Sequence, residues 1–400
     1  MPEVRVHPAN PRLTFDPLRP NDDDPYPLYR RLRDEAPLYR NEEWDFWAVS
    51  RYEDVHLAAR DWETFSSAEG NDLDESALLF APAGELTHAD PPLHTRLRDV
   101  VKREFGISTV QNRLEPLVRA RVQHLIASIY GRERIDLAAE LAIPLSVSVI
   151  CLWLGFPESD HAHLLSCFRA TQARTPGEVR LPPAALAGCN AIRDYFVEAV
   201  VARHRLAQDD LLTVIAKAES EGTLSEDEAV GAAILLFAAG MSSTSALLSN
   251  SLLHLQNFGR QRELLCETPS IIPLAVEELL RFDAPFQWFT RVTTRDVEVH
   301  ERRIPAGARV VLLWASANRD ERRWDRPDEL DLKRDPKRHI AFGEGIHHCL
   351  GAPLARLEAK VLLAELMPRI AEYQIAGPVQ RVHTASERTI TNLPAHVLWS

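Results

Sequence analysis

The sequence predicts an α-rich fold with small β-sheets, and three observations support this. Long stretches carry apolar residues at helical spacing, whereas strand-like runs are few and short. The 400 residues are 45% hydrophobic and 26% charged, a composition typical of a soluble globular protein with a large buried core. No linker-like or low-complexity tract divides the chain. One domain is therefore expected over residues 1–400, beginning with an extended segment over residues 1–20.

The helical periodicity recurs along most of the chain. Helices are expected, in order, at Tyr26–Glu35, Tyr52–Arg60, Pro92–Glu104, Val110–Tyr130, Leu137–Leu154, Ala184–Ala207, Ala229–His254 and Leu274–Phe282. Short strands are expected at Val297–Val299 and Arg309–Leu313, around the turn Pro305–Gly307. Between Thr64 and Asp90 no period persists, and such a long loop usually has a function. We expect this loop to be a lid over a substrate site.

Charge, hydropathy and cysteine content exclude several classes of protein. The formal net charge of −12 argues against general nucleic-acid binding. No apolar run reaches the 18 residues of a membrane span, and Met1–Pro20 is too charged for a signal peptide, so a cytoplasmic protein is expected. The five cysteines are odd in number and lack CxxC spacing, which argues against disulfides and zinc.

One decapeptide, Phe342–Gly351, places a single cysteine in a glycine-rich loop directly before a helical pattern. Gly343 and Gly345 permit backbone conformations closed to other residues and a close approach to a flat cofactor, and Gly351 is expected to do the same. Backbone N–H groups of the loop and the following helix are expected to lower the pKa of the Cys349 thiol and keep it ionised. A thiolate held in this way can ligate iron.

At every fixed position this decapeptide matches the pattern Phe-Gly-any-Gly-any-His-any-Cys-any-Gly, and it therefore resembles the cysteine-ligand loop of the cytochrome P450 family. The resemblance implies a soluble bacterial-type P450 fold, with haem b between a long oxygen-binding helix and the helix after the cysteine loop. It makes Cys349 the axial thiolate ligand and places Phe342, Gly343 and Gly351 beside the haem.

Glu278 and Arg281 are three residues apart on one helix face, a spacing that most often gives a solvated surface pair. In the P450 family the same spacing marks a buried pair joined by a downstream arginine, and the resemblance assigns that place to Arg334. The implied role of the three is structural.

The two propionates of a buried haem require cationic or hydrogen-bonding partners. His94 and Arg98 lie four residues apart, hence on one helix face, and resemble the family's propionate-binding pair. Arg291 resembles the arginine of the strand after the Glu-Arg helix, and His347 the histidine of the cysteine loop. The alternative for each is an ordinary surface charge.

The long helix Ala229–His254 has small residues at its middle. Gly240 costs about 1 kcal/mol relative to alanine, which either ligand access or a tight helix crossing would explain. By resemblance this is the oxygen-binding helix, with Ala239 and Gly240 beside the haem. The family's acid and first threonine are here Ser242 and Ser243.

This departure leaves hydroxyl groups but no carboxylate to deliver protons from solvent. Three explanations compete: ordered water or substrate groups carry the protons, peroxide is the oxidant, or monooxygenation has been lost. We prefer the first, with a relay of Ser242, Ser243 and water to which Thr244 contributes. Thr244 is alternatively a packing hydroxyl bonded to its own helix.

The resemblance also suggests a substrate pocket with apolar walls suited to an aromatic or fused-ring compound. Its expected residues are Leu79, Phe80, Ala239, Phe286, Gln287, Trp288, Phe289, Ile390 and Thr391. The alternative is that the aromatic side chains of Phe286, Trp288 and Phe289 belong to the core.

No glycine-rich dinucleotide fingerprint occurs in the sequence, so the expected electron donors are a ferredoxin and its reductase. A basic dock for an acidic iron-sulfur protein is expected before the cysteine loop, and the alternative is a merely solvated basic face. Its residues are Arg322, Arg323, Arg326, Lys333, Arg334, Lys337 and Arg338, with Arg334 the buried exception.

The expected activity is oxygen insertion, demethylation or oxidative coupling by a monomer that acts in secondary metabolism, with O2 as co-substrate. The alternatives are a peroxide-driven peroxygenase and a non-catalytic binding or recruitment module with the same fold.

Overall fold

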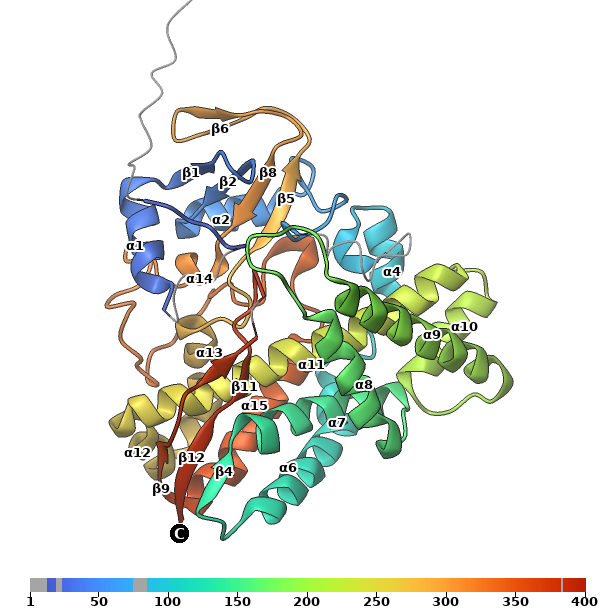
Figure 1. Ribbon diagram of the computed structural model, residues 1–400, viewed down its shortest axis with the longest axis vertical. Helices are drawn as coiled ribbons and strands as arrows, with labels where there is room; N and C mark the ends of the chain where they lie inside the picture. The colour runs from blue at the N-terminus through green and yellow to red at the C-terminus, as the bar shows by residue number, and fades with distance from the viewer. Residues whose placement is uncertain (1–12, 19–23, 75–84, 383) are drawn as a thin grey trace, which may run out of the picture.

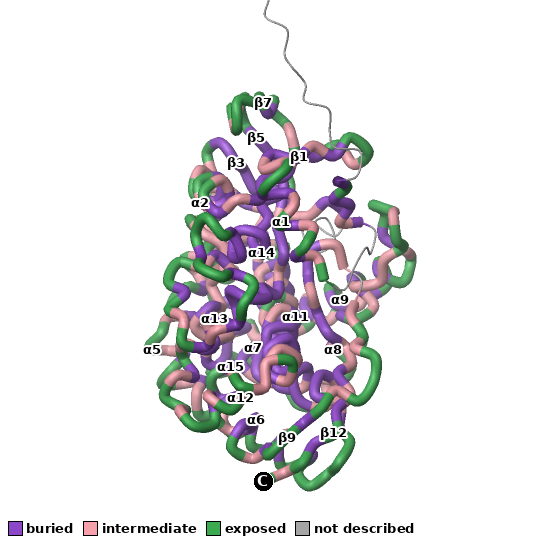
Figure 2. The backbone as a smooth tube through the Cα atoms, turned by 90° about the vertical axis from the view of Figure 1, so that its left-hand side faces the viewer, coloured by how far each residue is buried: buried purple, intermediate pink, exposed green. Residues whose placement is uncertain are grey.

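Helix α11 (Glu226–Asn257) crosses the middle of the molecule in the computed structural model, which describes residues 13–18, 24–74, 85–382 and 384–400. Most of α11 is buried, and the other helices surround it (Figures 1 and 2). Its first turn carries a capping box, in which Glu228 N–H donates to Ser225 Oγ at 3.2 Å and Ser225 N–H donates to Glu228 Oε2 at 2.8 Å. This cap fixes where the helix starts.

The remaining helices form a mainly α-helical body (Figure 1). They are α1 (Tyr26–Glu35), α2 (Tyr52–Arg60), α4 (Leu93–Val101), α5 (Ile107–Thr109), α6 (Glu115–Ile129), α7 (Ile143–Leu154), α8 (Glu158–Thr171), α9 (Pro183–Arg205), α10 (Leu211–Ser220), α12 (Gly259–Glu267), α13 (Ile272–Phe282), α14 (Trp314–Ala317) and α15 (Ala352–Leu366). The largest core cluster includes buried residues of α6, α7, α11 and α15.

A five-stranded sheet with the strand order β1-β2-β8-β5-β3 lies at one end of the molecule, beside α1, α2 and α14 (Figure 1). Its strands are β1 (Leu38–Asn41), β2 (Phe46–Val49), β3 (Phe65–Ser66), β5 (Phe289–Thr293) and β8 (Arg309–Leu312). β2 and β8 are parallel, with Phe46 opposite Arg309, whereas β5 and β8 are antiparallel, with Arg291 opposite Val310. A buried cluster that includes Val49, Val55 and Val310 joins this sheet to α2.

Three smaller sheets complete the strands of the described residues. β6 (Val297–Val299) pairs with β7 (Arg302–Ile304), and β10 (Gln380–Arg381) pairs with β11 (Ile390–Asn392). β12 (Pro394–Trp399) lies between β4 (Arg134–Asp136) and β9 (Ile370–Ile375). The expected α-rich fold with small sheets is confirmed, and so are the strands around Pro305–Gly307.

Each expected helix is found, with ends shifted by a few residues. The expected helix Pro92–Glu104 ends three residues early, at Val101, and Ala229–His254 is extended by three residues at each end, to Glu226–Asn257. The stretches Val110–Tyr130 and Leu137–Leu154 each begin with five residues of π-helix. The sequence analysis missed α5, α8, α10, α12 and α14, which are short or polar on their outer faces. α11 is long and apolar enough to cross a membrane, but 67% of its apolar window is buried inside the protein.

The middle of α11 crosses α7 closely. A Cβ atom added to Gly240 would lie 2.8 Å from the Ile150 side chain, closer than real Cβ contacts. The tight crossing therefore explains this glycine, although Gly240 also lines the cavity described below.

Candidate functional site

The loop before α15 is folded by its own backbone. Gly343 N–H donates to Ile340 O at 3.0 Å, and Cys349 N–H donates to Phe342 O at 2.8 Å. Gly343 and Gly345 have φ angles of 69° and 70°, as the sequence suggested. A Cβ atom on Gly345 would also lie 2.6 Å from Ala59 O. Both glycines are therefore required by the local geometry.

Gly351 differs from this expectation, because its φ of −79° is open to any residue. A Cβ atom there would make an ordinary contact, 3.9 Å from Cys349 Sγ. Gly351 is thus not needed for an unusual backbone angle, and no protein atom crowds its position.

Cys349 lies on a cavity wall at the start of α15. Burial raises the pKa of its thiol, while the N–H groups of Gly351 and Ala352 and the guanidinium groups of Arg98 and Arg356 lower it. The expected N–H groups are thus present and favour the thiolate, while burial without a bound cation favours the neutral thiol.

The cavity lies between the cysteine loop, α11 and β5. Its apolar residues include Leu86, Phe105, Ile150, Leu235, Leu236, Leu247, Phe286, Phe289 and Leu354, none of which the sequence analysis named except Phe286 and Phe289. Phe342, Gly343, Gly351, Ala239 and Gly240 also line it. Distant segments thus form one largely apolar chamber around Cys349.

Cationic and imidazole side chains gather at one end of this chamber. Arg98, Arg291 and His347 line it, and the His94 and His347 rings are 4.5 Å apart between centroids. Within the described residues His94 Nε2 and His347 Nε2 are buried without a hydrogen-bond partner. Arg291 is buried and donates to Thr290 O at 2.6 Å, but no carboxylate of the described residues pairs with it.

The positive charge of Arg291 and the neighbouring imidazole of His94 make protonation of His347 less favourable. Burial, followed by Arg291 and His94, lowers the pKa of His347 to about 2, and burial lowers the pKa of Arg291 to about 10. Burial of unpaired donors is costly unless a ligand satisfies them. The cluster therefore suits a ligand that carries carboxylates, such as the propionates of a haem.

The α11 face of the cavity carries two of the three predicted hydroxyl groups. Ser243 and Thr244 line the cavity, and Ser243 Oγ donates to Ala239 O at 2.9 Å. Ser242 is buried but does not line it, because it lies on a neighbouring face of the helix.

The segment before Arg291 divides between the cavity and the core. Phe286 and Phe289 line the cavity, with ring centroids 4.7 Å apart. Trp288 is 1% exposed, donates from Nε1 to Ala385 O and packs in the core below α1. Gln287 is buried and donates to Ala284 O at 2.7 Å. Neither lines the cavity, which corrects the prediction for both.

Ile390 and Thr391, which were predicted to line the substrate pocket, do not line the cavity. Ile390 is fully buried in the main core, and Thr391 Oγ1 donates to Gln380 O within the β10–β11 pair. The residue that reaches the Phe286 wall is Glu387, through an isolated β-bridge. Leu79 and Phe80, predicted for the lid loop, lie outside the described residues.

Glu278 and Arg281 form a fully buried, bidentate ion pair at 2.7 and 2.8 Å. Arg334 Nε donates to Glu278 Oε1 at 3.1 Å. Arg281 also donates to the Asn318 and Pro327 carbonyl groups, both at 2.9 Å. The three residues thus fasten α13 to the chain that leads to the cysteine loop.

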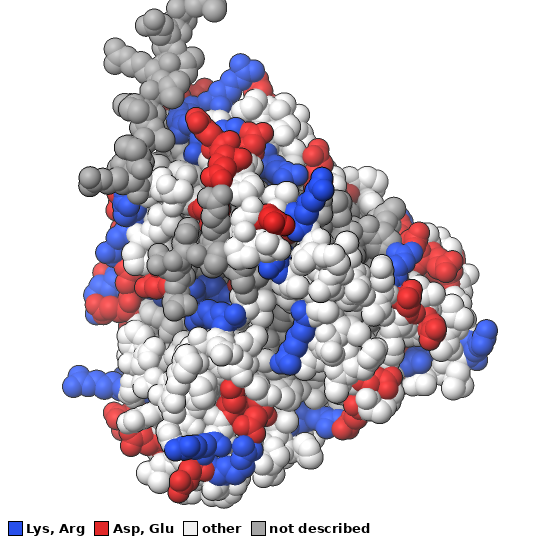
Figure 3. Space-filling model, in the orientation of Figure 1, with Lys and Arg blue, Asp and Glu red and all other residues white. Residues whose placement is uncertain are grey.

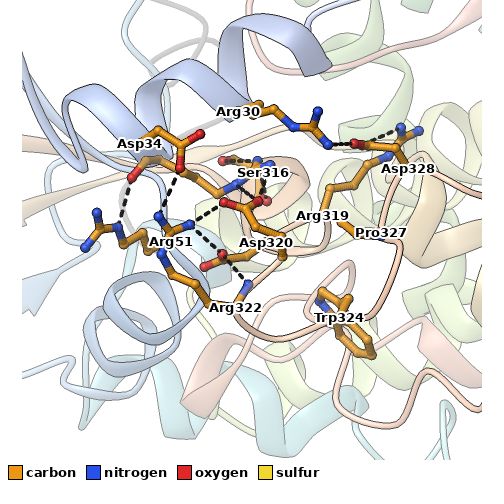
Figure 4. A network of polar contacts seen from close by, with 12 residues as sticks. Arg30, Asp34, Arg51, Ser316, Arg319, Asp320, Arg322, Trp324, Pro327 and Asp328 are labelled. Carbon is orange, nitrogen blue, oxygen red and sulfur yellow. Dashed lines mark hydrogen bonds and ion pairs between the residues drawn. The ribbon is translucent and has the colours of Figure 1, made fainter.

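Several of the basic residues before the cysteine loop are paired with acids. Arg322 contacts Asp34 at 3.0 Å in a network that also includes Arg319 and Asp328 (Figure 4). Arg326 pairs with Glu329 and Lys337 with Asp335. Arg323, Lys333 and Arg338 are exposed and have no ion pair among the described residues. On the face drawn in Figure 3, acidic and basic side chains are interspersed.

Two buried carboxyl groups with a raised pKa were not singled out by the sequence analysis. Glu358, in α15, is 1% exposed, and burial raises its pKa well above the usual range. Glu387 is 8% exposed, and burial raises its pKa to about 7. Nothing in the local sequence distinguishes them from surface acids.

A larger cleft of about 820 Å³ lies between α1 and the end of α11. Its walls include Tyr26, His254, Asp283 and Arg388, and no cysteine is among the described residues that line it. The chemistry predicted from the sequence therefore belongs to the smaller chamber.

Known proteins resemble this chain along most of its length. A family model described as Cytochrome P450 matches residues 270–371. Putative cytochrome P450 123 from Mycobacterium tuberculosis is 36% identical, over 98% of this chain and 99% of that protein. Beta-dihydromenaquinone-9 omega-hydroxylase from the same organism is 34% identical, over 95% of this chain and 77% of that protein.

The fold is shared as well. The crystal structure of CYP109E1 from Bacillus megaterium in complex with testosterone matches with a TM-score of 0.86 and 29% identity, over 93% of this chain and 97% of that one. With this fold, and with relatives at 34–36% identity over nearly its whole length, the chain belongs to the cytochrome P450 family, the haem-thiolate monooxygenases.

Proposed function

We propose that this P450 uses dioxygen and two external electrons to hydroxylate, demethylate or oxidatively couple an apolar, ring-bearing small molecule. The observation that carries the proposal is one apolar chamber with Cys349 on its wall and unpaired donors at one end. We further propose that residues 1–400 form one haem domain, which acts as a cytoplasmic monomer.

Cys349 is the proposed axial ligand, with Phe342 and Gly343 beside the haem. Because burial raises the pKa of the free thiol, iron bound to Cys349 would have to displace a proton from it. The Gly351 and Ala352 N–H groups then stabilise the thiolate.

The propionates are the proposed partners of His94, Arg98, Arg291 and His347. The orphaned His94 and His347 nitrogens and the unpaired Arg291 charge support this, since two carboxylates satisfy them together.

When bound, the haem would supply the redox chemistry that transfers one oxygen atom of O2 to the substrate. Ala239 and Gly240 leave space on that side of the chamber, and Ser243 presents a hydroxyl there. Ser243 Oγ now donates to its own helix, and a rotation of χ1 turns this donor towards a ligand. Ser242, Ser243 and Thr244 are the proposed proton relay.

A peroxide-driven peroxygenase is the second candidate, and the serine at position 242 favours it, because no acid on α11 delivers protons there. The ratio of turnover with peroxide to turnover with a ferredoxin chain distinguishes the two. A higher rate with peroxide supports the peroxygenase.

The apolar walls favour a hydrophobic substrate. Two relatives are consistent with this, since one is named for hydroxylation of a dihydromenaquinone and the other was crystallised with testosterone. The proposed electron donors are a ferredoxin and its reductase, and the exposed Arg323, Lys333 and Arg338 support an acidic docking partner.

Phe286 and Trp288 should differ in what their removal changes. Phe286→Ala removes part of the cavity wall and is expected to weaken binding of an aromatic ligand about 10-fold, with little loss of stability. Trp288→Ala removes a fully buried core side chain and is expected to cost about 3–5 kcal/mol of unfolding free energy. Spectral titration and urea unfolding measure the two effects, and the reverse pattern would exchange the roles assigned to these residues.

The proposed function is tested on the purified ferric protein with a panel of aromatic and terpenoid compounds. The reduced carbonyl complex should have the thiolate-type Soret shift, and ligands that fit should convert the iron to high spin. Absence of the thiolate signature would contradict the proposal. Conversion by terpenoids but not by aromatic compounds would identify the substrate class.

A further inference from the structure

Glu387 is a buried carboxylic acid in the segment between β10 and β11, beside the cavity wall. Its backbone forms a β-bridge with Phe286, and the neighbouring bonds Gln287 N–H to Ser386 O (2.7 Å) and Arg388 N–H to Pro285 O (2.9 Å) hold the segment in place. Only 8% of Glu387 is exposed. Two strands of backbone therefore position a residue that sequence analysis overlooked.

The surroundings of this carboxyl group are hydroxylic rather than charged. Burial raises the pKa of Glu387 to about 7, and the nearby hydroxyls of Thr389 and Ser242 oppose this shift without reversing it. The adjacent Arg388 is engaged elsewhere, with its Nε 3.2 Å from Asp283 Oδ1. Among the described residues no charged side chain contributes to the shift. The group can therefore gain and lose a proton near neutral pH.

The carboxyl group also has unused hydrogen-bonding capacity. Within the described residues, Glu387 Oε1 and Thr389 Oγ1 are both buried and have no hydrogen-bond partner. Buried polar atoms of this kind are normally satisfied by an ordered water or by a proton on the acid.

Ser242 lies on α11 directly before the chamber wall, although it does not line the cavity itself. It is the position at which the family's oxygen-binding helix carries its acid, and the next residue, Ser243, lines the cavity. Phe286, which pairs with Glu387, lines the cavity as well. The carboxyl group missing from α11 thus has a counterpart on a different segment, next to the same hydroxyl.

We propose that Glu387 holds and passes protons through the Ser242 hydroxyl, and so replaces the carboxyl group that α11 lacks. This inference rests on the proposed monooxygenase function. In each transfer the carboxyl O–H bond breaks and its proton moves to Ser242 Oγ, while the Ser242 proton passes to water or Ser243. Glu387 then takes a proton from solvent. Two transfers supply the two protons that, with two electrons from the redox partner, convert the second oxygen atom of O2 to water.

In this proposal Glu387 supplies protons but does not contact the haem. Its protonation state can therefore be measured by spectroscopy, without enzymatic turnover. Infrared difference spectra between acid and alkaline pH should contain a protonated carboxyl band that titrates near pH 7 and is absent in Glu387→Gln. Since the folded pKa of about 7 exceeds the ordinary 4.5, this residue makes stability fall as pH rises from about 4.5 to 7. Glu387→Gln should remove that component.

The kinetic test compares two oxidants in the haem-loaded protein. With O2 and the redox chain, Glu387→Gln should lower product formation per electron pair about 10- to 100-fold, whereas turnover with peroxide, which brings its own protons, should change little. Ser242→Ala should have the same effect. Ser249→Ala, at a fully buried serine seven residues further along α11, is the matched control and should behave as wild type.

Rescue separates proton supply from a structural role. Adding Ser242→Asp to Glu387→Gln returns a carboxyl group to the helix and should restore most of the product yield. Unchanged yield in Glu387→Gln, persistence of the titrating band, or failure of this rescue would overturn the proposal. If Glu387→Gln does not fold, an unchanged yield in Ser242→Ala overturns it. A wild-type protein without the thiolate-type carbonyl spectrum would instead contradict the proposed function, while the infrared band still reports on Glu387.

Discussion

Cys349→Ala should abolish the thiolate-type spectrum of the reduced carbonyl complex and lower substrate oxidation at least about 100-fold, because even outer partners of metal ligands are worth about 10- to 100-fold. The sulfur lies on the cavity wall, where two backbone N–H groups and Arg98 favour its anion. A methyl group there can neither ligate iron nor carry charge. Absorption spectra of the reduced protein under carbon monoxide measure the loss.

A second cysteine provides the control for this substitution. Cys167 is half-buried in α8, near His163, and is not among the residues that line the chamber. Cys167→Ala should therefore keep the normal spectrum. Because a ligand that binds only the folded state stabilises it, Cys349→Ala should also unfold at a lower temperature than Cys167→Ala. A normal spectrum in Cys349→Ala would mean that another residue ligates the iron.

Glu278→Ala should destabilise the protein by about 3–5 kcal/mol, the usual result of leaving one buried charge without its partner. Glu278 and Arg281 are both fully buried, and Glu278 also accepts from Arg334 Nε and from the Asp331 N–H group at 3.1 Å. Removing the carboxylate therefore leaves two guanidinium groups without their anionic partner and one backbone N–H without its acceptor. Urea unfolding of the haem-loaded protein, followed by tryptophan fluorescence, measures the change.

The exposed pair Arg326 and Glu329 has the same spacing and serves as the matched control. Glu329→Ala should leave the unfolding midpoint nearly unchanged, since solvent screens such pairs. The double variant Glu278→Met/Arg281→Met should recover only part of the loss, because Arg281 also binds the Asn318 and Pro327 carbonyl groups. A loss below about 1 kcal/mol for Glu278→Ala would contradict a stabilising role.

The cysteine loop was predictable because its geometry is local. Ten residues contain both glycines with positive φ and the cysteine, and the loop closes on itself through the bond from Cys349 N–H to Phe342 O. Helix positions were predictable for a similar reason, because the apolar periodicity of a helix depends only on residues that are close in the sequence. The buried state of Glu278 and Arg281 came only from the family resemblance, because their spacing alone favours an exposed pair.

The walls of the chamber were harder to predict. In an extended strand alternate side chains point to opposite faces, so Phe289 and Arg291 line the cavity while Trp288 faces the core. By residue type alone, Phe286, Trp288 and Phe289 were equally good candidates for the cavity wall. The alternation of side chains along a strand would have placed Trp288 and Phe289 on opposite faces. Glu387 carries no such signal, since its burial depends on a bridge to Phe286, about one hundred positions earlier in the chain.

The order of strands in the five-stranded sheet determines how late during synthesis the sheet can be completed. β2 lies between β1 and β8, but roughly 260 residues (309 minus 49) separate the end of β2 from β8. At about 5–20 residues per second, their synthesis takes about 13–52 s. Throughout this time the nascent hairpin presents the open edge of Phe46–Val49, which can pair with other chains. Slower translation should therefore lower the soluble yield unless a chaperone covers this edge.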